Sequence, residues 1–413
     1  MKTNAYALPV MMAIIIVQQI DRNIVNVLLE PLKAEFSLTD GQVGLLAGTA
    51  FAITYMMAGL PLAILADRVN RRNLLAALVA IWSALTAVCG LAQNMAALVI
   101  ARLGVGAAEA GAVPTSLSIL SDATPIKKRG AIAGLIYASA GFGTFVSFLA
   151  GGYLAAEYGW RAAFFATGLP GVVLAGLLLV LVREPKRAPL AHKEAGLPGN
   201  ILSGIGALLF HPVLGWLYWG ATLYTMCASG IGAWAVSVLV RIHGFDLKSA
   251  GLAVACASGL GGCLGTALTG RLSDAASARH PGGALRVAAF AAVVYLCAAL
   301  AFANASSPTA AVVTLCFVGF SSQAYTGPVN GVISKVAPPE SRTLGFALYS
   351  VFGSVLGVAI GPGLIGVLSD QLGGGQSVVR AILLVLPTLI LPAFMFAIGG
   401  VCLDRLSQRP ATT

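Results

Sequence analysis

Charged residues are scarce in this chain of 413 residues. Asp, Glu, Lys and Arg make up only 10% of it, and 58% of the residues are hydrophobic. Soluble domains are typically about 25% charged. The apolar residues come in long runs rather than in the amphipathic stripes of soluble helices, and about 20 such residues suffice to cross a bilayer. The composition therefore excludes an ordinary soluble domain and predicts an all-α polytopic membrane protein.

Signals of metal binding and of catalysis are also missing. The seven cysteines are scattered within apolar runs without metal-type spacing, and the four histidines lie at or beyond the ends of predicted spans. The sequence has no HExxH and no GxSxG motif. We therefore expect no metal, no cofactor and no enzymatic activity. A signalling receptor is not favoured either, because there is no extramembrane domain to which a signal could pass.

Hydropathy predicts twelve membrane spans, six on each side of the most polar break in the chain. No signal-peptide cleavage site follows the first run, so that run is expected to be a retained span. The break reads REPKRAPLAHKEAGLPGN and covers residues 183–200. It divides the chain into a six-helix bundle at 1–182, a linker at 183–212 and a second six-helix bundle at 213–413. The predicted spans cover residues 6–29, 41–66, 74–92, 95–121, 130–155, 162–182, 213–240, 249–273, 285–303, 309–336, 343–368 and 378–401.

The basic residues are distributed unevenly between the two sides of the predicted membrane. Of the 25 Lys and Arg residues, 18 fall on one side, five on the other and two within spans. Positive charge accumulates on the cytoplasmic side of membrane proteins. The net charge of +10 is thus explained by topology and does not indicate nucleic-acid binding. We expect a multi-pass protein of the bacterial inner membrane with both termini and the linker in the cytoplasm.

The two halves share a sequence plan. LADRVNRR (65–72) is echoed by LSDAASAR (272–279), TPIKKRGAIAG (124–134) by APPESRTLGFA (337–347), and GGYLAAEYG (151–159) by IGVLSDQLG (365–373). The offsets are close to half the chain length. Two pseudo-symmetric six-helix halves are typical of transporters whose substrate site lies between the halves near the membrane midplane.

Several motifs carry a resemblance to a known family. GLPLAILADRVNRRNLL (59–75) resembles the loop between helices 2 and 3 that marks the major facilitator superfamily, although Ala63 and Asn70 stand where glycine is usual. The DRxNRR form, the pair Asp21–Arg22 and ARLGVGAAEAG (101–111) resemble the spinster branch. VREP, VRIHG and GPVNGVISKVAPPESR also resemble bacterial spinster-like members. The Asp-Arg pair together with Arg-x6-Glu-Ala is also similar to the anion–cation symporters that carry sugar acids and other organic anions, so that branch stays open as the alternative.

The resemblance implies a fold and a gate. The fold would be the major facilitator fold, in which helices 1 and 4 line the cavity and a monomer is the working unit. In that family the loop between helices 2 and 3 bridges to the second half when the cytoplasmic side is closed. The expected gating residues are Asp67, Arg68, Arg71 and Arg72.

Charged residues inside predicted spans are the main functional signal. Six polar residues interrupt VQQIDRNIVNV (17–27), among them Asp21 and Arg22. A charge at mid-membrane costs roughly 2.5–3.5 kcal/mol on insertion scales, so such charges persist where they pair or face a wet cavity. Arg102 and Glu109 project from one face of the fourth span, about 10 Å apart. Asp21 and Arg102 are predicted to lie at about the same depth below the outer membrane surface, so the two side chains are expected to pair. Glu109 lies deeper and is then left without an ionic partner. A static ion pair that fixes helix packing is the alternative.

Such an arrangement can couple substrate to protons. A substrate anion that takes Arg102 leaves Asp21 without its counter-charge, and a carboxyl in a low-dielectric cavity then binds a proton more readily. We therefore predict Asp21 and Glu109 as proton-coupling residues, and Arg102 and Arg22 as substrate contacts. Neighbouring helix positions point about 100° apart, so Arg22 can instead face an adjacent helix, and both readings stay open.

The second half has no charge near mid-span and offers neutral side chains instead. Packing is the commoner role of aromatic residues in apolar spans, and it remains the alternative here. The glycine–proline run GVAIGPGLIG (357–366) is expected to serve close helix packing and bending. The candidate substrate contacts are Tyr137 in the fifth span and, in the second half, Tyr224, Trp234, Gln323, Tyr325 and Asn330.

The function that fits these features best is proton-coupled secondary transport by alternating access. The substrate would be an organic anion or an amphiphilic, lipid-like anion, and the partners would be that molecule, protons and the bilayer. The alternative is a drug–proton antiporter, which would require a wide apolar cavity that tolerates cations. A cavity arginine argues mildly against that alternative.

Overall fold

The computed structural model describes residues 6–185, 201–338 and 341–408, and the regular elements in these ranges are all helical. The predicted all-α class is confirmed. The first half contains α1 (Ala7–Phe36), α2 (Asp40–Gly44), η1 (Leu45–Thr49), α3 (Ala50–Arg68), α4 (Arg71–Cys89), α5 (Met95–Glu109), α6 (Ala112–Ala123) and α7 (Ile126–Leu181). After the linker helix α8 (Ile201–Leu209), the second half contains α9 (Leu214–His243), α10 (Leu247–Val254), η2 (Ala255–Gly261), α11 (Gly262–Arg279), α12 (Gly283–Ala303), α13 (Pro308–Ser322), α14 (Thr326–Val336), α15 (Arg342–Leu348), η3 (Tyr349–Leu356), α16 (Gly357–Leu372), α17 (Ser377–Val385), η4 (Leu386–Leu389) and α18 (Ile390–Ser407).

Ten helices in the described part of the chain are long and apolar enough to cross a membrane, against the twelve spans predicted. Two local features account for the difference. The predicted spans 130–155 and 162–182 both lie in α7, which runs on through a kink at Gly159 with a φ of 83°, a value that glycine adopts without strain. The predicted span 309–336 is divided between α13 and α14, because the chain leaves helical geometry at Gln323.

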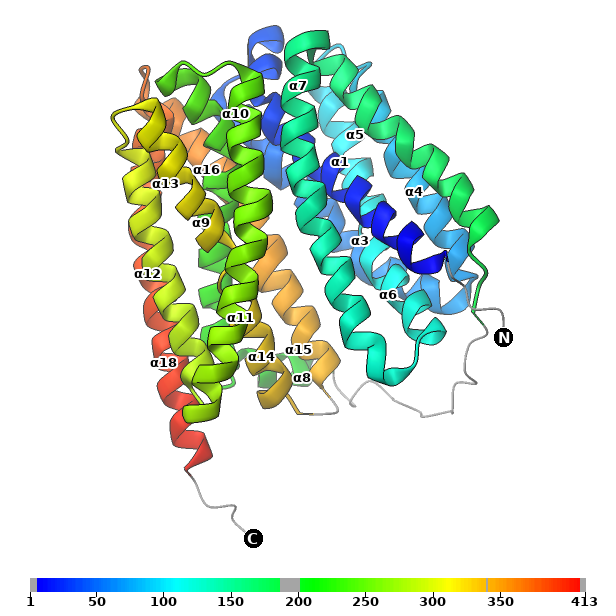
Figure 1. Ribbon diagram of the computed structural model, residues 1–413, viewed down its shortest axis with the longest axis vertical. Coiled ribbons are helices and arrows are strands. Elements are labelled where there is room, and N and C mark those ends of the chain that lie inside the picture. The colour runs from blue at the N-terminus through cyan, green and yellow to red at the C-terminus, as the bar shows by residue number, and fades with distance from the viewer. Residues whose placement is uncertain (1–5, 186–200, 339–340, 409–413) are drawn as a thin grey trace.

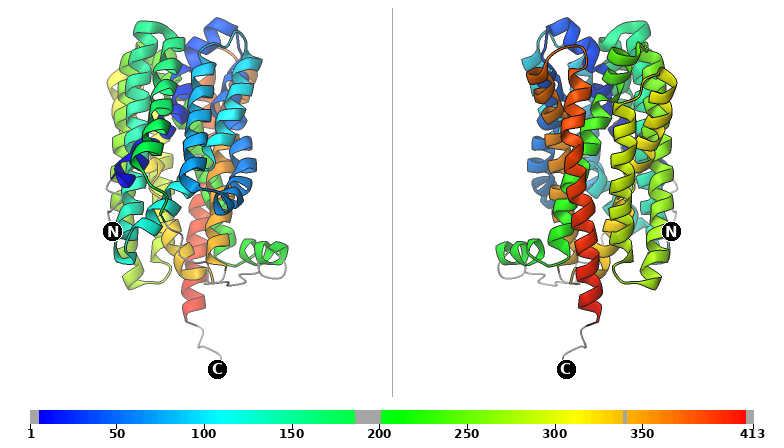
Figure 2. Two further views of the ribbon diagram at one scale, coloured as in Figure 1. Left: turned by 90° about the vertical axis from the view of Figure 1, so that its right-hand side faces the viewer. Right: turned by 90° about the vertical axis from the view of Figure 1, so that its left-hand side faces the viewer.

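The two halves form two helical bundles that stand side by side (Figure 1). They meet at one end of the molecule, where α1 and α16 finish and α2 and α10 begin; we call this the closed end. The opposite end, where α7 finishes at Leu181 and α9 begins at Leu214, is the linker end. Helix α8 lies there, across the direction of the bundle helices (Figure 2).

Backbone contacts through glycine bring the halves together at the closed end. A Cβ atom on Gly44 of α2 would overlap the main-chain carbonyl of Pro362 in α16. The equivalent contact on the other side joins Gly152 of α7 to Gly251 of α10, whose Cβ would overlap the Phe148 carbonyl. Because glycine lacks a side chain, it allows such close helix approach.

The buried apolar residues form two clusters that reflect this closure. One is continuous across the halves: it includes Leu28, Leu46 and Phe164 of the first half together with Trp234 and Ile365 of the second. The other is confined to the first half and draws on α1, α3, α4, α5, α6 and α7. The apolar core is thus shared between the halves at the closed end.

Candidate functional site

Helices α1 and α5 bring Asp21 and Arg102 together inside the first half. Both residues are buried, with exposed fractions of 0% and 1%. The expected side-chain ion pair is not formed, however. Arg102 Nη1 instead donates to the main-chain carbonyl of Asp21 at 3.0 Å, and Nη2 donates to that of Arg22 at 3.5 Å. The prediction was right about the proximity of the two residues and wrong about the atoms that meet.

The Asp21 carboxyl group faces helix α4, which sequence reasoning had not included. The Trp82 indole and the Thr86 hydroxyl lie beside it as possible donors, but among the described residues neither carboxyl oxygen receives a hydrogen bond of normal geometry. Trp82 Nε1 and Thr86 Oγ1 are buried and unpartnered in the same way. Their spacing of four residues puts them on one helix face, a signal that was present in IWSALT (81–86).

Glu109 sits where a predicted continuous span breaks into two helices. It is the last residue of α5, and α6 begins at Ala112. A helix end leaves main-chain carbonyls without partners, and Gln18 Nε2 of α1 donates to the Glu109 carbonyl at 3.1 Å. The Glu109 side chain is fully buried, and its two carboxyl oxygens have no hydrogen-bond partner among the described residues.

Two guanidinium groups flank one aromatic ring in this cluster. Arg22 lies 4.8 Å and Arg102 5.3 Å from the centre of the Phe51 ring, and Arg22 lies 5.3 Å from that of Tyr55. Cations over aromatic faces are attracted to them. Arg22 therefore lies over two rings of the adjacent helix α3 at the edge of the cluster, and both predicted roles, substrate contact and helix packing, stay open. Tyr137 of α7 lies near Tyr55 and has an exposed fraction of 64%.

The aromatic candidates of the second half lie in its interior. Tyr224 is fully buried, stacks between Tyr295 and Tyr325, and donates to the Ser321 carbonyl at 2.5 Å. Trp234 is also fully buried, and its Nε1 donates to the Pro362 carbonyl. Their polar atoms are satisfied inside the bundle in this conformation, which fits the packing alternative, and the substrate role stays a prediction.

Three further candidates of the second half differ in exposure. Tyr325 is 3% exposed and shares a hydrogen bond of 2.5 Å with Thr225, which makes it part of the same packed aromatic group. Gln323 is exposed at the break between α13 and α14, and Asn330 is half-buried on α14. Gln323 and Asn330 remain predicted substrate contacts.

The described contacts of the 67–72 motif lie in the first half and, at Glu184, at the start of the linker. Arg71 is buried; its Nη1 pairs with Asp122 at 2.6 Å and its Nε with Glu184 at 2.8 Å. Arg72 donates its main-chain N–H to Glu184 and its Nη1 to the Val182 carbonyl. Arg68 is exposed, and the Asp67 side chain lies outside what the structure describes. The motif thus ties the end of α7 to the start of α4.

This arrangement predicts a stability effect for Arg71. We expect Arg71→Gln to lower the apparent melting temperature of the purified protein by several degrees. Removing the guanidinium leaves the carboxylates of Asp122 and Glu184 without their counter-charge. The two acids are partly exposed, so we expect a cost of about 1–3 kcal/mol, below that of a fully buried pair. Arg68→Gln is the matched control. Equal melting curves for both variants would contradict the prediction.

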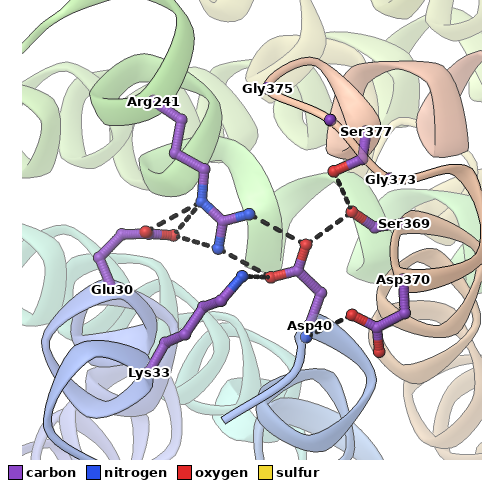
Figure 3. A pocket seen from close by; sticks show the side chains of 10 residues that line it. Glu30, Lys33, Asp40, Arg241, Ser369, Asp370, Gly373, Gly375 and Ser377 are labelled. Atoms are coloured by element: carbon purple, nitrogen blue, oxygen red, sulfur yellow. Dashed lines mark hydrogen bonds and ion pairs between the residues drawn. The ribbon is translucent and has the colours of Figure 1, made fainter. Parts of the chain in front are cut away.

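A charged network that sequence reasoning missed joins the halves at the closed end (Figure 3). Arg241 of α9 contacts Glu30 of α1 at 2.8 Å and Asp40 of α2 at 2.9 Å. Asp40 also accepts hydrogen bonds from Lys33 at 2.5 Å and from Ser369 of α16 at 2.6 Å. These residues come from both halves and surround a cavity of about 350 Å³.

The same α16 segment caps the start of α2. The Asp370 carboxylate accepts the main-chain N–H groups of Asp40 and Gly41, each at 2.8 Å. A carboxylate is favourable at a helix N-terminus, where N–H groups lack partners. The pseudo-symmetric contact is weaker: Lys248 of α10 pairs with Glu157 of α7 at 3.5 Å, with both side chains about half exposed. The closed end is therefore held by one buried and one exposed clamp.

Two helical bundles that enclose buried charged residues are typical of a membrane transporter, and comparison with known proteins supports this class. The model of the Major Facilitator Superfamily matches residues 11–362 and, in a second match, 259–412. The chain belongs to this family. Its members are transporters, not enzymes, so the expectation of no enzymatic activity is confirmed. The chain is a multi-pass membrane protein.

Individual relatives support the spinster-like branch. The chain is 30% identical to an MFS-type efflux pump of Mycolicibacterium smegmatis, over 94% of this chain and 89% of that protein. It is 25% identical to protein spinster homolog 1 of Xenopus tropicalis, over 86% and 71%. It is 28% identical to a probable L-galactonate transporter of Escherichia coli, over 63% and 59%.

The fold is that of solved transporters. A bacterial homolog of the human lysosomal transporter Spinster, in an inward-facing and unoccupied conformation, superposes with a TM-score of 0.82 over 100% of this chain and 99% of that one, at 24% identity. The predicted resemblance to spinster-like members of the major facilitator superfamily is confirmed.

Proposed function

We propose that the chain is a proton-coupled secondary transporter of an organic anion or an anionic, lipid-like molecule, working by alternating access. One observation carries the proposal: in one buried cluster, two guanidinium groups lie over Phe51 while the carboxyl oxygens of Asp21 and Glu109 form no hydrogen bond of normal geometry. Guanidinium is well shaped for carboxylate or phosphate. Unpaired acids at membrane depth are typical of proton pathways.

The relatives support an anionic substrate from two directions. A probable L-galactonate transporter and a probable galactarate/D-glucarate transporter are named for small organic acids. A relative from Arabidopsis thaliana is named as a probable sphingolipid transporter. Arg22 and Arg102 suit the carboxylate of an organic acid or the acidic head of an anionic lipid, and the exposed ring of Tyr137 suits an apolar or aromatic body.

The proposal includes the orientation of the protein in the membrane and the roles of its two halves. We place the protein in the inner membrane with both termini and the linker end on the cytoplasmic side, as the positive-inside rule favours. Residues 1–182 and 213–413 then act as the two moving halves around the 183–212 linker. A monomer is the proposed working unit, as the family resemblance implies.

A drug–proton antiporter is the second candidate. The similarity to an efflux pump over nearly the whole chain favours it, and the same two acids would then serve proton exchange. The two candidates differ in the sign of the charge that the cavity accepts, so they are separated by the role of Arg102.

The test is substitution of that arginine. We expect Arg102→Lys to lose at least tenfold in affinity for the transported anion although the charge is kept, because lysine cannot reproduce the planar fork and a hydrogen bond to a charged group is worth about 1.5–3 kcal/mol. Binding to purified protein would be measured against sugar acids, aromatic acids and lysolipids, with uptake into liposomes as the second readout.

Arg161→Lys is the matched control, since Arg161 is partly exposed and pairs with Glu35 at the closed end. It should leave affinity unchanged. A cationic dye transported equally well by the wild type and by Arg102→Ala would overturn the organic-anion proposal in favour of drug efflux.

A further inference from the structure

A second cavity lies in the other half, far from the charged cluster. It opens at the linker end where α11 finishes and α12 begins, and its volume is about 600 Å³. Helix α12 stands at the edge of the second bundle that is remote from the first half (Figure 1). The cavity shares no lining residue with the site around Arg102. Its walls include Leu272, Ala276 and Arg279 of α11, His280, and Arg286, Val287 and Phe290 of α12.

The two helices present matching faces to this cavity. Lining positions 272, 275, 276 and 279 follow the i, i+3, i+4, i+7 spacing of one helix face, and so do 283, 286, 287 and 290. Along both helices the character changes in the same direction. Arg279, His280 and Arg286 lie at the linker end, whereas Leu272 lies seven residues further inward on α11, about 10 Å along the axis.

The inner part of the groove is apolar and uncovered. Leu272 has an exposed fraction of 49% and Phe290 of 69%. Both belong to helices that are long and apolar enough to cross a membrane, so lipid chains are the natural medium around them. A groove with cations at the membrane surface and apolar walls inward has the polarity profile of a phospholipid.

The charge at the mouth is positive and partly fixed in place. Arg286 pairs with Asp404 of α18 at 2.5 Å, and Asp404 also accepts the main-chain N–H of Gly282 at 2.7 Å. This pair holds Arg286 at the rim. Arg279 and His280 are exposed beside it, and none of the residues that line the described cavity is acidic. With Arg286 balanced by Asp404, the net positive charge among the cavity-lining residues comes from Arg279, and it favours an anion.

We propose that this groove binds an anionic phospholipid from the bilayer leaflet at the linker end. Its phosphate would contact Arg279 and Arg286, and one acyl chain would lie along Leu272, Val287 and Phe290. Basic pockets between membrane helices bind the head groups of anionic lipids. The site is a docking site for a resident lipid and stands independently of the transported substrate.

The experiment compares lipids of different head groups on the purified full-length chain. Native mass spectrometry in detergent would measure binding of dioleoyl phosphatidylglycerol and of dioleoyl phosphatidylcholine. Arg279→Gln should weaken phosphatidylglycerol binding about fivefold, since one basic residue near an anionic lipid is worth about 1 kcal/mol. Arg271→Gln is the control: Arg271 is exposed on the same helix and does not line the cavity.

A second variant and a second probe complete the test. Phe290→Ala should also weaken phosphatidylglycerol binding while leaving every charge in place. Inorganic phosphate should compete poorly, because it lacks the acyl chain. Equal phosphatidylglycerol binding by wild type and Arg279→Gln would overturn the proposal. So would equal binding of the two lipids, or competition by phosphate at the concentration at which phosphatidylglycerol binds.

Discussion

Neither Asp21→Asn nor Glu109→Gln should accumulate substrate in liposomes when a pH gradient is the only driving force. Both variants remove a carboxyl that lies fully buried with unpartnered oxygens. If these carboxyls carry the coupled protons, their amides bind none, so the expected loss of accumulation is complete. At least one of the two variants should retain substrate counterflow, because exchange of substrate for substrate needs no net proton movement.

The sign of the coupling follows from the relation between the acids and the arginine. If substrate binding raises proton affinity, protons raise substrate affinity by the same factor, and the result is symport. If protons and substrate compete for one group, the same residues give exchange. In the structure, Arg102 is bonded to main-chain carbonyls of Asp21 and Arg22. If Arg102 binds the anion, as proposed, the acids and the anion-binding group are separate, which favours symport.

The control for this experiment lies on the same helix as Asp21. Glu35 is a partly exposed acid at the end of α1 that pairs with Arg161, outside the buried cluster. Glu35→Gln should accumulate substrate as the wild type does. Full pH-driven accumulation in both Asp21→Asn and Glu109→Gln would show that the two acids are structural and that the coupling model is wrong.

Part of this site could be predicted because its signals are local. A charge inside an apolar run is conspicuous in any sequence, and helical geometry converts a seven-residue spacing such as that of Arg102 and Glu109 into one face. The atoms that meet were not predictable in the same way. Whether Arg102 reaches the Asp21 carboxylate or its main-chain carbonyl depends on side-chain conformation, which periodicity does not encode.

Burial of the aromatic candidates shows a second limit. Tyr224 and Trp234 both lie in the apolar helix α9, as a pore-lining residue could, and this helix is only slightly amphipathic. Which face of such a helix meets a cavity is decided by its neighbours. In the structure these neighbours offer main-chain carbonyls, of Ser321 to Tyr224 and of Pro362 to Trp234, and the two rings are packed inside.

The closed-end network could not be predicted because its members are far apart in sequence. Asp40 is 201 residues from Arg241 and 329 residues from Ser369. Near the ends of predicted spans, charged residues are expected for topology alone, so nothing marks these as partners. Only the pairing of α2 with α9 and α16 across the halves reveals them as one unit.

That network leads to the second large expected effect. Arg241→Gln should shift the population of the transporter toward states that are open at the end now closed. The substitution leaves Glu30 and Asp40, both largely buried, without their shared guanidinium. Truncating one partner of a buried hydrogen-bonded charge pair costs about 2–5 kcal/mol, and each 1.4 kcal/mol is about tenfold. A shift of at least tenfold in the ratio of open to closed molecules is therefore expected.

Spin labels on one exposed loop residue of each half would measure the shift. Gln93 follows α4 and Ser306 follows α12, and both are exposed. The distance between labels at these positions should lengthen or broaden in Arg241→Gln, and pulsed electron paramagnetic resonance would record it. The labels would be placed on a background in which the exposed native cysteines are replaced by serine.

The Lys248–Glu157 pair supplies the control. It shows whether the shift requires loss of the buried network or follows from losing any ion pair between the halves. Lys248→Gln removes the pair with Glu157, which is long and about half exposed. Exposed pairs contribute about 0–1 kcal/mol, so this variant should keep the wild-type distance distribution. If Lys248→Gln and Arg241→Gln behaved alike, or if neither moved the labels, the buried network would not hold the closed end. In that case the glycine contacts between α2 and α16 would be sufficient to keep the halves together there.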